Sequence, residues 1–64
     1  METHRYAIGQ TVRFRPRLAG GAVFGGYEIL RLLPEEEGEP RYRIKSVRES
    51  HERVANESQL ERVL

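Results

Sequence analysis

The sequence predicts an all-β fold, a small five-stranded, partly open barrel with one helical or 3-10 turn before the last strand. Short runs in which apolar and polar residues alternate, as they do in β-strands, lead to this prediction, and glycine and proline separate these runs. A chain of 64 residues allows one domain with a thin core. We expect a flexible lead-in over residues 1–8 and a single barrel domain over residues 9–64.

The first strand is predicted over residues 11–15. Val12 and Phe14 alternate there with polar neighbours, so both are expected to face the core. Pro16 ends the strand, because proline has no amide hydrogen to donate to a β-ladder. A loop with two pairs of glycines follows over residues 16–26.

The only apolar patch of this loop is Ala22-Val23-Phe24, and it has two interpretations. In one, Phe24 folds back to cap the barrel end. In the other, it is a partner-contacting aromatic residue on a mobile loop. We favour the first, because so small a core needs every aromatic side chain. The second gives a candidate protein-binding set of Phe24, Val23, Gly25 and Gly26.

The next two strands are predicted to form a hairpin. The second strand spans Tyr27–Leu33, with a β-bulge near Leu30 that lets residues on both sides of it face the core. The third spans Pro40–Val47, and its alternation sends Tyr42 and Ile44 inward. The glutamates of the connecting loop, residues 34–40, are interpreted as a solvated tip, because they lack the ligand spacing of a calcium loop.

The C-terminal part is predicted to hold a fourth strand over Glu52–Asn56, with Val54 facing inward. Ser58 and Glu61 have capping-box spacing, which indicates one helical or 3-10 turn that places Leu60 in the core. A last strand over residues 61–64 then turns Val63 inward. Apolar residues at positions 60, 63 and 64 also fit the spacing of a helix, so the alternative is a three- or four-stranded sheet with a packed terminal helix over residues 58–64.

Residue types needed for catalysis or metal binding are not grouped in this sequence. Cysteine is absent, and His4 and His51 have no cluster of ligand-type residues beside them. No nucleophile elbow or complete phosphate-binding loop is present. We therefore predict a protein that is not an enzyme and uses no cofactor or metal. Its polar N-terminus and short apolar runs lead us to expect a cytoplasmic protein without membrane contact.

With 11 basic and 10 acidic residues, the chain lacks the strong positive charge of a dedicated nucleic-acid binder. Five basic residues are nevertheless expected on the outer faces of the first and third strands: Arg13, Arg15, Arg41, Arg43 and Lys45. If the second strand lies between them, they form either a face that follows a phosphate backbone or a ladder of alternating charge that neutralises itself. Glu28, on the second strand, favours the ladder.

Several motifs together resemble a group of short α-proteobacterial proteins with no assigned function. These motifs are GQTVRF at 9–14, GYEI at 26–29, LP at 33–34, YRIKS at 42–46, HERV at 51–54 and ESQL at 57–60. More distantly, the layout is similar to small SH3-like barrels of the KOW and Tudor kinds. The resemblance implies an SH3-like fold and no particular activity, because such barrels bind peptides, modified tails, RNA or ribosomal partners.

The combined prediction is a non-catalytic protein-interaction module or accessory subunit, a monomer or weak homodimer, whose partner is an unidentified protein. The candidate surface is the glycine-flanked loop around Phe24. The alternative is weak, salt-dependent binding of RNA or DNA through the five basic residues of the first and third strands.

Overall fold

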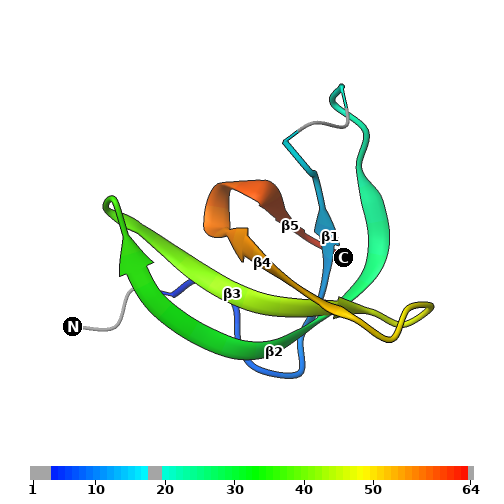
Figure 1. Ribbon diagram of the computed structural model, residues 1–64, viewed down its shortest axis with the longest axis horizontal. Coiled ribbons are helices and arrows are strands. Elements are labelled where there is room, and N and C mark those ends of the chain that lie inside the picture. The colour runs from blue at the N-terminus through cyan, green and yellow to red at the C-terminus, as the bar shows by residue number, and fades with distance from the viewer. Residues whose placement is uncertain (1–3, 18–19, 64) are drawn as a thin grey trace.

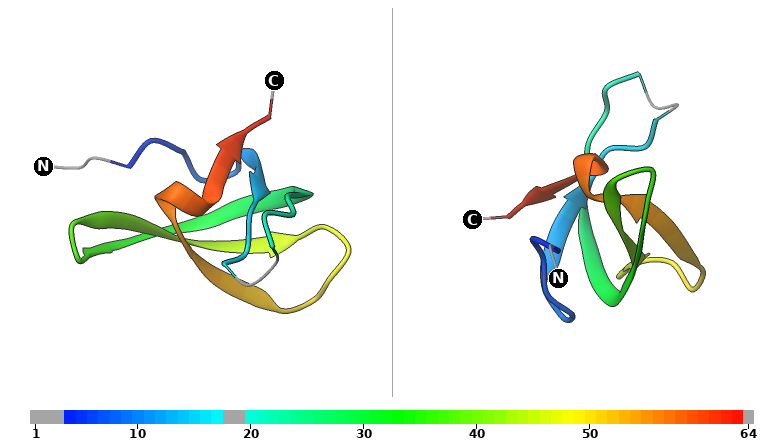
Figure 2. Two further views of the ribbon diagram at one scale, coloured as in Figure 1. Left: turned by 90° about the horizontal axis from the view of Figure 1, so that it is seen from above. Right: turned by 90° about the vertical axis from the view of Figure 1, so that its left-hand side faces the viewer.

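The computed structural model describes residues 4–17 and 20–63, which form one curved antiparallel sheet (Figure 1). Its strands lie in the order β4-β3-β2-β1-β5. Their bounds are β1 (Thr11–Phe14), β2 (Phe24–Glu36), β3 (Glu39–Ser46), β4 (Glu52–Asn56) and β5 (Leu60–Arg62), with the 3-10 helix η1 (Glu57–Gln59) between the last two. The sheet bends round on itself without closing, so β4 and β5 are its two edges (Figure 2). The predicted all-β, partly open barrel is confirmed.

The concave side of the sheet holds a core of nine residues. Four of them, Val12, Ile29, Tyr42 and Ile44, lose all or nearly all of their exposed surface. The others are Tyr6, Phe14, Tyr27, Ala55 and Leu60. Tyr27 and Tyr42 therefore point inward, as the alternation of polar and apolar residues predicted.

Strand β2 is longer than predicted at both ends. It begins at Phe24 and continues to Glu36, because a two-residue turn replaces the expected loop over 34–40. Both turn residues have positive φ, 54° at Glu37 and 80° at Gly38, as a tight hairpin turn requires. The predicted irregularity near Leu30 is confirmed by a shift of register between residues 29 and 31, and Leu32 packs against the core.

The prediction for β4 is wrong about which residue faces the core. Val54 pairs with Arg43 on the outer face and is 44% exposed, whereas Ala55 pairs with Tyr42 and is buried. Opposed residues on neighbouring antiparallel strands share a face, so the register of β4 against β3 decides which side chain points inward. The small side chain therefore lies opposite the large tyrosine ring.

The C-terminal ending is a 3-10 turn followed by a strand, which excludes the terminal helix. Leu60 is buried as predicted, but the cap differs: the Asn56 amide donates to Gln59 Oε1 at 2.9 Å, and the Ser58 amide donates to Glu39 Oε2 at 2.7 Å. The predicted pairing of Ser58 with Glu61 is therefore wrong. Strand β5 ends at Arg62, and Val63, predicted inward, is 38% exposed. Leu64 lies outside the described residues.

The segment before β1, which was expected to be a flexible lead-in, contributes to the barrel. Tyr6 belongs to the core, whereas Ile8 is 64% exposed. Backbone hydrogen bonds from Gly9 N–H to Ile29 O at 2.8 Å and from Ile29 N–H to Gln10 O at 2.9 Å join the end of this segment to β2. No helix in residues 4–17 or 20–63 has the length and apolar character needed to span a membrane.

Candidate functional site

Four of the five aromatic residues are buried in the core, and Phe24 is the exception. Tyr6, Phe14, Tyr27 and Tyr42 are 0–7% exposed, while Phe24 is 49% exposed. Phe24 begins β2 and pairs with Phe14, the last residue of β1 (Figure 1 shows the two strands side by side). Phe24 is therefore not buried in the core, as the favoured prediction required, but lies half exposed opposite the core residue Phe14.

The other residues predicted beside Phe24 leave this part of β2 sparsely covered. Val23 is 39% exposed. Gly25 and Gly26 occupy a bulge between the pairs Val12–Tyr27 and Phe14–Phe24. A Cβ placed on Gly25 would meet nothing within 4 Å, so the backbone here is open to close approach by another chain. Phe24, Val23, Gly25 and Gly26 thus form a continuous stretch, which we call the Phe24 surface.

The five basic residues predicted on the outer face are not gathered into one patch. A row of paired residues, Thr11, Glu28, Lys45 and Glu52, crosses four strands of the sheet. Arg13 and Arg15, which come after Thr11 in the chain, lie on one side of this row. Arg41 and Arg43, which come before Lys45, lie on its other side. β2 does lie between β1 and β3, as expected, but the two arginine pairs diverge from the central row.

Acidic neighbours also hold most of these basic side chains. Arg41 pairs with Glu36 at 2.7 Å and Arg43 with Glu52 at 3.1 Å, and Arg15 pairs with Glu61. Lys45 has a glutamate opposite it on each neighbouring strand. This arrangement agrees more closely with the self-neutralising alternative than with a continuous basic face.

The N-terminal segment is held against the barrel by the hydroxyl of Tyr42. This oxygen accepts hydrogen bonds from the Arg5 amide at 2.8 Å and the Tyr6 amide at 3.2 Å, and its proton is donated to Glu57 Oε2 at 2.5 Å. The Arg5 amide also donates to Glu57 Oε2 at 2.7 Å. His4 Nε2 lies 2.7 Å from Leu33 O, which adds a contact to β2. The path of the segment is therefore fixed by polar contacts as well as by burial of the Tyr6 ring.

Burial, and then the hydrogen bond to Glu57, raises the pKa of Tyr42 from 10.0 to about 12. In the unfolded chain the phenol ionises near pH 10. Because the folded state keeps the proton to higher pH, this contribution to stability is complete below pH 10 and decreases as the pH rises from 10 to 12.

We expect the stability difference between the native protein and Tyr42→Phe to shrink between pH 10 and pH 12, as urea unfolding at several alkaline pH values would measure. A difference that stays constant up to pH 12 would contradict the raised pKa.

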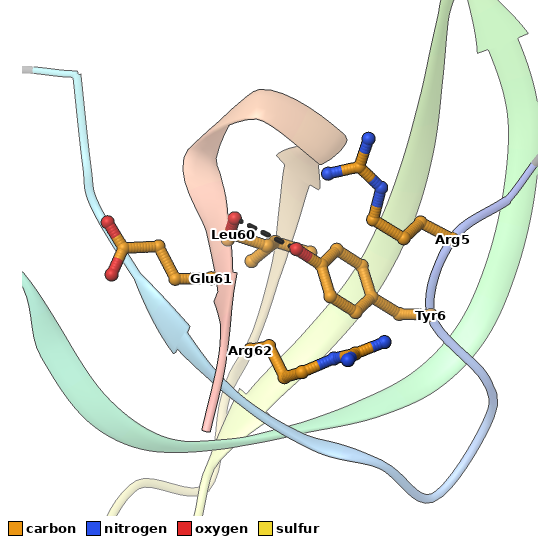
Figure 3. A pocket seen from close by; sticks show the side chains of 5 residues that line it. All are labelled: Arg5, Tyr6, Leu60, Glu61 and Arg62. Carbon is orange, nitrogen blue, oxygen red and sulfur yellow. Dashed lines mark hydrogen bonds between the residues drawn. The ribbon is translucent and has the colours of Figure 1, made fainter. Parts of the chain in front are cut away.

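A pocket of about 520 Å³ lies between this N-terminal segment and β5, lined by Arg5, Tyr6, Leu60, Glu61 and Arg62 (Figure 3). The Tyr6 hydroxyl donates to Leu60 O at 3.1 Å and fixes the ring between the two arginines. Figure 3 shows the Glu61 side chain extending to the other side of β5, where it pairs with Arg15. Neither Arg5 nor Arg62 forms an ion pair with any residue that the structure describes.

Within residues 4–17 and 20–63, no group of three or more His, Asp and Glu side chains could hold a metal ion. His51 is exposed and lies 3.5 Å from Glu49 in the β3–β4 turn.

The chain has no significant match to a family model, a curated protein or a solved structure. The similarity to short α-proteobacterial proteins and to SH3-like barrels therefore stays a prediction.

Proposed function

We propose that this protein is a non-catalytic protein-interaction module that binds its partner through the Phe24 surface. One observation carries the proposal: Phe24 is the only aromatic residue of the sequence that the core leaves half exposed. In a domain with so small a core, an aromatic residue outside it forgoes stabilisation that burial would supply. Aromatic residues flanked by accessible backbone are typical of interface centres.

The glycines beside Phe24 support the same proposal. Gly25 has open space where a side chain would be, so a partner chain can approach the backbone of β2 next to the ring. A location in the cytoplasm and a monomeric or weakly dimeric state belong to this proposal too.

Nucleic-acid binding through the predicted basic residues is the weaker alternative. Arg15, Arg41 and Arg43 already have carboxylate partners, which a phosphate backbone would have to displace. Glu28 and Glu52 lie on either side of Lys45. An RNA titration at low and physiological salt tests this alternative, which requires an affinity that falls steeply as salt is added.

We expect Phe24→Ala to abolish capture of the partner while costing less stability than truncation of a fully buried aromatic residue. The side chain is half exposed, so its truncation removes about half the buried apolar area that a core phenylalanine would lose. The measurement compares proteins recovered on the tagged native chain and on the variant, together with their thermal unfolding. Val54→Ala is the matched control, because Val54 is an exposed apolar residue, 44% accessible, on the edge strand β4, away from the Phe24 surface.

A second variant separates loss of a contact from loss of the fold. Gly25→Leu adds bulk where the structure has open space, and should block the partner without lowering the melting temperature. The proposal fails if Phe24→Ala destabilises the protein as a core truncation does while the recovered proteins stay the same. It also fails if Val54→Ala removes the same partners as Phe24→Ala.

A further inference from the structure

We propose that the pocket between the N-terminal segment and β5 binds a phosphate monoester through Arg5 and Arg62. This site is independent of the Phe24 surface and of the basic residues on the outer face of the sheet. Figure 3 shows the two arginine side chains on either side of the Tyr6 ring, and all three residues line the pocket.

Both arginines extend from backbone positions that the fold determines. The Arg5 amide is bonded to Tyr42 Oη at 2.8 Å and to Glu57 Oε2 at 2.7 Å. Arg62 pairs with Val12 of β1, so its position follows from the register of β5. The Tyr6 ring separates the two residues and is itself fixed by its hydrogen bond to Leu60 O at 3.1 Å. The fold therefore fixes the backbone positions from which the two arginine side chains extend before any ligand arrives.

The charge of the pocket selects the class of ligand. Glu61, its one acidic lining residue, is paired with Arg15 on the other side of β5. The other lining residues leave two guanidinium charges without a carboxylate partner among the described residues. A phosphate monoester carries nearly two negative charges at neutral pH and offers several acceptor oxygens to the planar donors of arginine. A single carboxylate would compensate only one of the charges.

The pocket walls favour a small polar ligand over a stacked base. Tyr6 is 5% exposed, so its ring face is not available for stacking on a nucleobase. Leu60 is equally buried, which leaves the arginine head groups as the main contact surface. The inferred ligand is thus a small phosphorylated molecule held by its phosphate group.

The test is an amide and arginine-Nε NMR titration of the full chain at pH 7.5 with inorganic phosphate, glycerol 3-phosphate and acetate at equal ionic strength. We expect saturable shifts at Arg5, Tyr6 and Arg62 with both phosphates, with a Kd of about 1–10 mM, the range typical of a weak small-ligand site. Glycerol 3-phosphate binding at least as tightly as inorganic phosphate indicates an ester as the ligand, and markedly tighter binding of the inorganic ion overturns that assignment. Equal shifts with acetate overturn the choice of phosphate.

Three charge-matched variants decide whether these two residues form the site. Arg5→Gln and Arg62→Gln should each weaken phosphate binding at least about fivefold, while Arg48→Gln should change it less than about twofold, because Arg48 is an exposed arginine of the β3–β4 turn. The backbone contacts of Arg5 do not involve its guanidinium group, so Arg5→Gln keeps them and should keep the native spectrum. Absence of saturable shifts, or an equal loss in Arg48→Gln, overturns the site.

Discussion

Replacing Ile44 by alanine is expected to destabilise this protein by about 2–5 kcal/mol, the largest loss among the substitutions proposed as tests. Ile44 has no exposed surface and lies on β3, opposite Ile29 of β2, at the centre of the concave face. Truncation removes buried methyl groups and leaves a cavity that neighbouring strands cannot fill without breaking their ladders. For a domain of this size, whose total stability is of order 3–10 kcal/mol, this loss is a large fraction of the whole.

Thermal and urea unfolding followed by circular dichroism measures this effect. One kcal/mol corresponds to roughly 4–8 °C in Tm for a domain of this length, so the expected shift exceeds about 10 °C. Val47→Ala, in the turn that follows the same strand, is the control, and its side chain is 71% exposed, so its shift should stay within about 0.5 kcal/mol. Similar melting of the two variants would mean that Ile44 is not at the centre of the core.

The alternation of apolar and polar residues predicted the strands well because each strand buries only its concave side. The run around Tyr42 and Ile44 on β3 therefore predicted both the strand and its inward residues correctly. The same reasoning failed at β4, where Arg53, Val54 and Ala55 offer two possible inward faces. We predicted that valine faces inward, but pairing with β3 placed alanine opposite Tyr42. Pairing is a long-range property that a short run does not encode.

The candidate sites depend on such long-range geometry even more strongly. Alternation correctly placed Arg13 and Arg43 on the outer face, yet only the register shows that they diverge from a row containing Glu28 and Glu52. The phosphate pocket was missed altogether. Its two arginines are at opposite ends of the chain, and no local pattern around residue 5 indicates that its segment docks beside β5.

Phe24 illustrates a different limit of sequence reasoning. The argument that a small core needs every aromatic residue favoured burial of this ring. The barrel fills its core with four other aromatic residues, one of which, Tyr6, comes from the segment expected to be a lead-in. Tyr6 lies beside Leu60 in the core, whereas Phe24 is left half exposed. Docking of the N-terminal segment thus shapes both the core and the phosphate pocket.

The Tyr42 hydroxyl is the contact on which this docking depends, and Tyr42→Phe is expected to cost about 1–3 kcal/mol. The substitution keeps the buried ring but removes the oxygen that accepts from the amides of Arg5 and Tyr6 and donates to Glu57. The Arg5 amide retains Glu57 Oε2, whereas the Tyr6 amide loses its hydrogen-bond acceptor in a buried setting. An unpaired buried donor costs its full desolvation energy, which is why removing one oxygen has so large an effect.

Tyr27→Phe is the matched control for this prediction. Tyr27 is also buried, at 7% exposure, but its hydroxyl makes no hydrogen bond to any residue that the structure describes. Its removal should therefore change stability by less than about 0.5 kcal/mol.

Amide hydrogen exchange adds a local readout: protection of the Tyr6 amide should fall in Tyr42→Phe before protection in β3 does. Equal stabilities of the two variants, or unchanged exchange at Tyr6, would show that the segment is held by burial of the Tyr6 ring alone. Loss at Tyr6 with an intact β3 would show that the hydroxyl holds the segment in place, and phosphate binding at Arg5 should then weaken in the same variant.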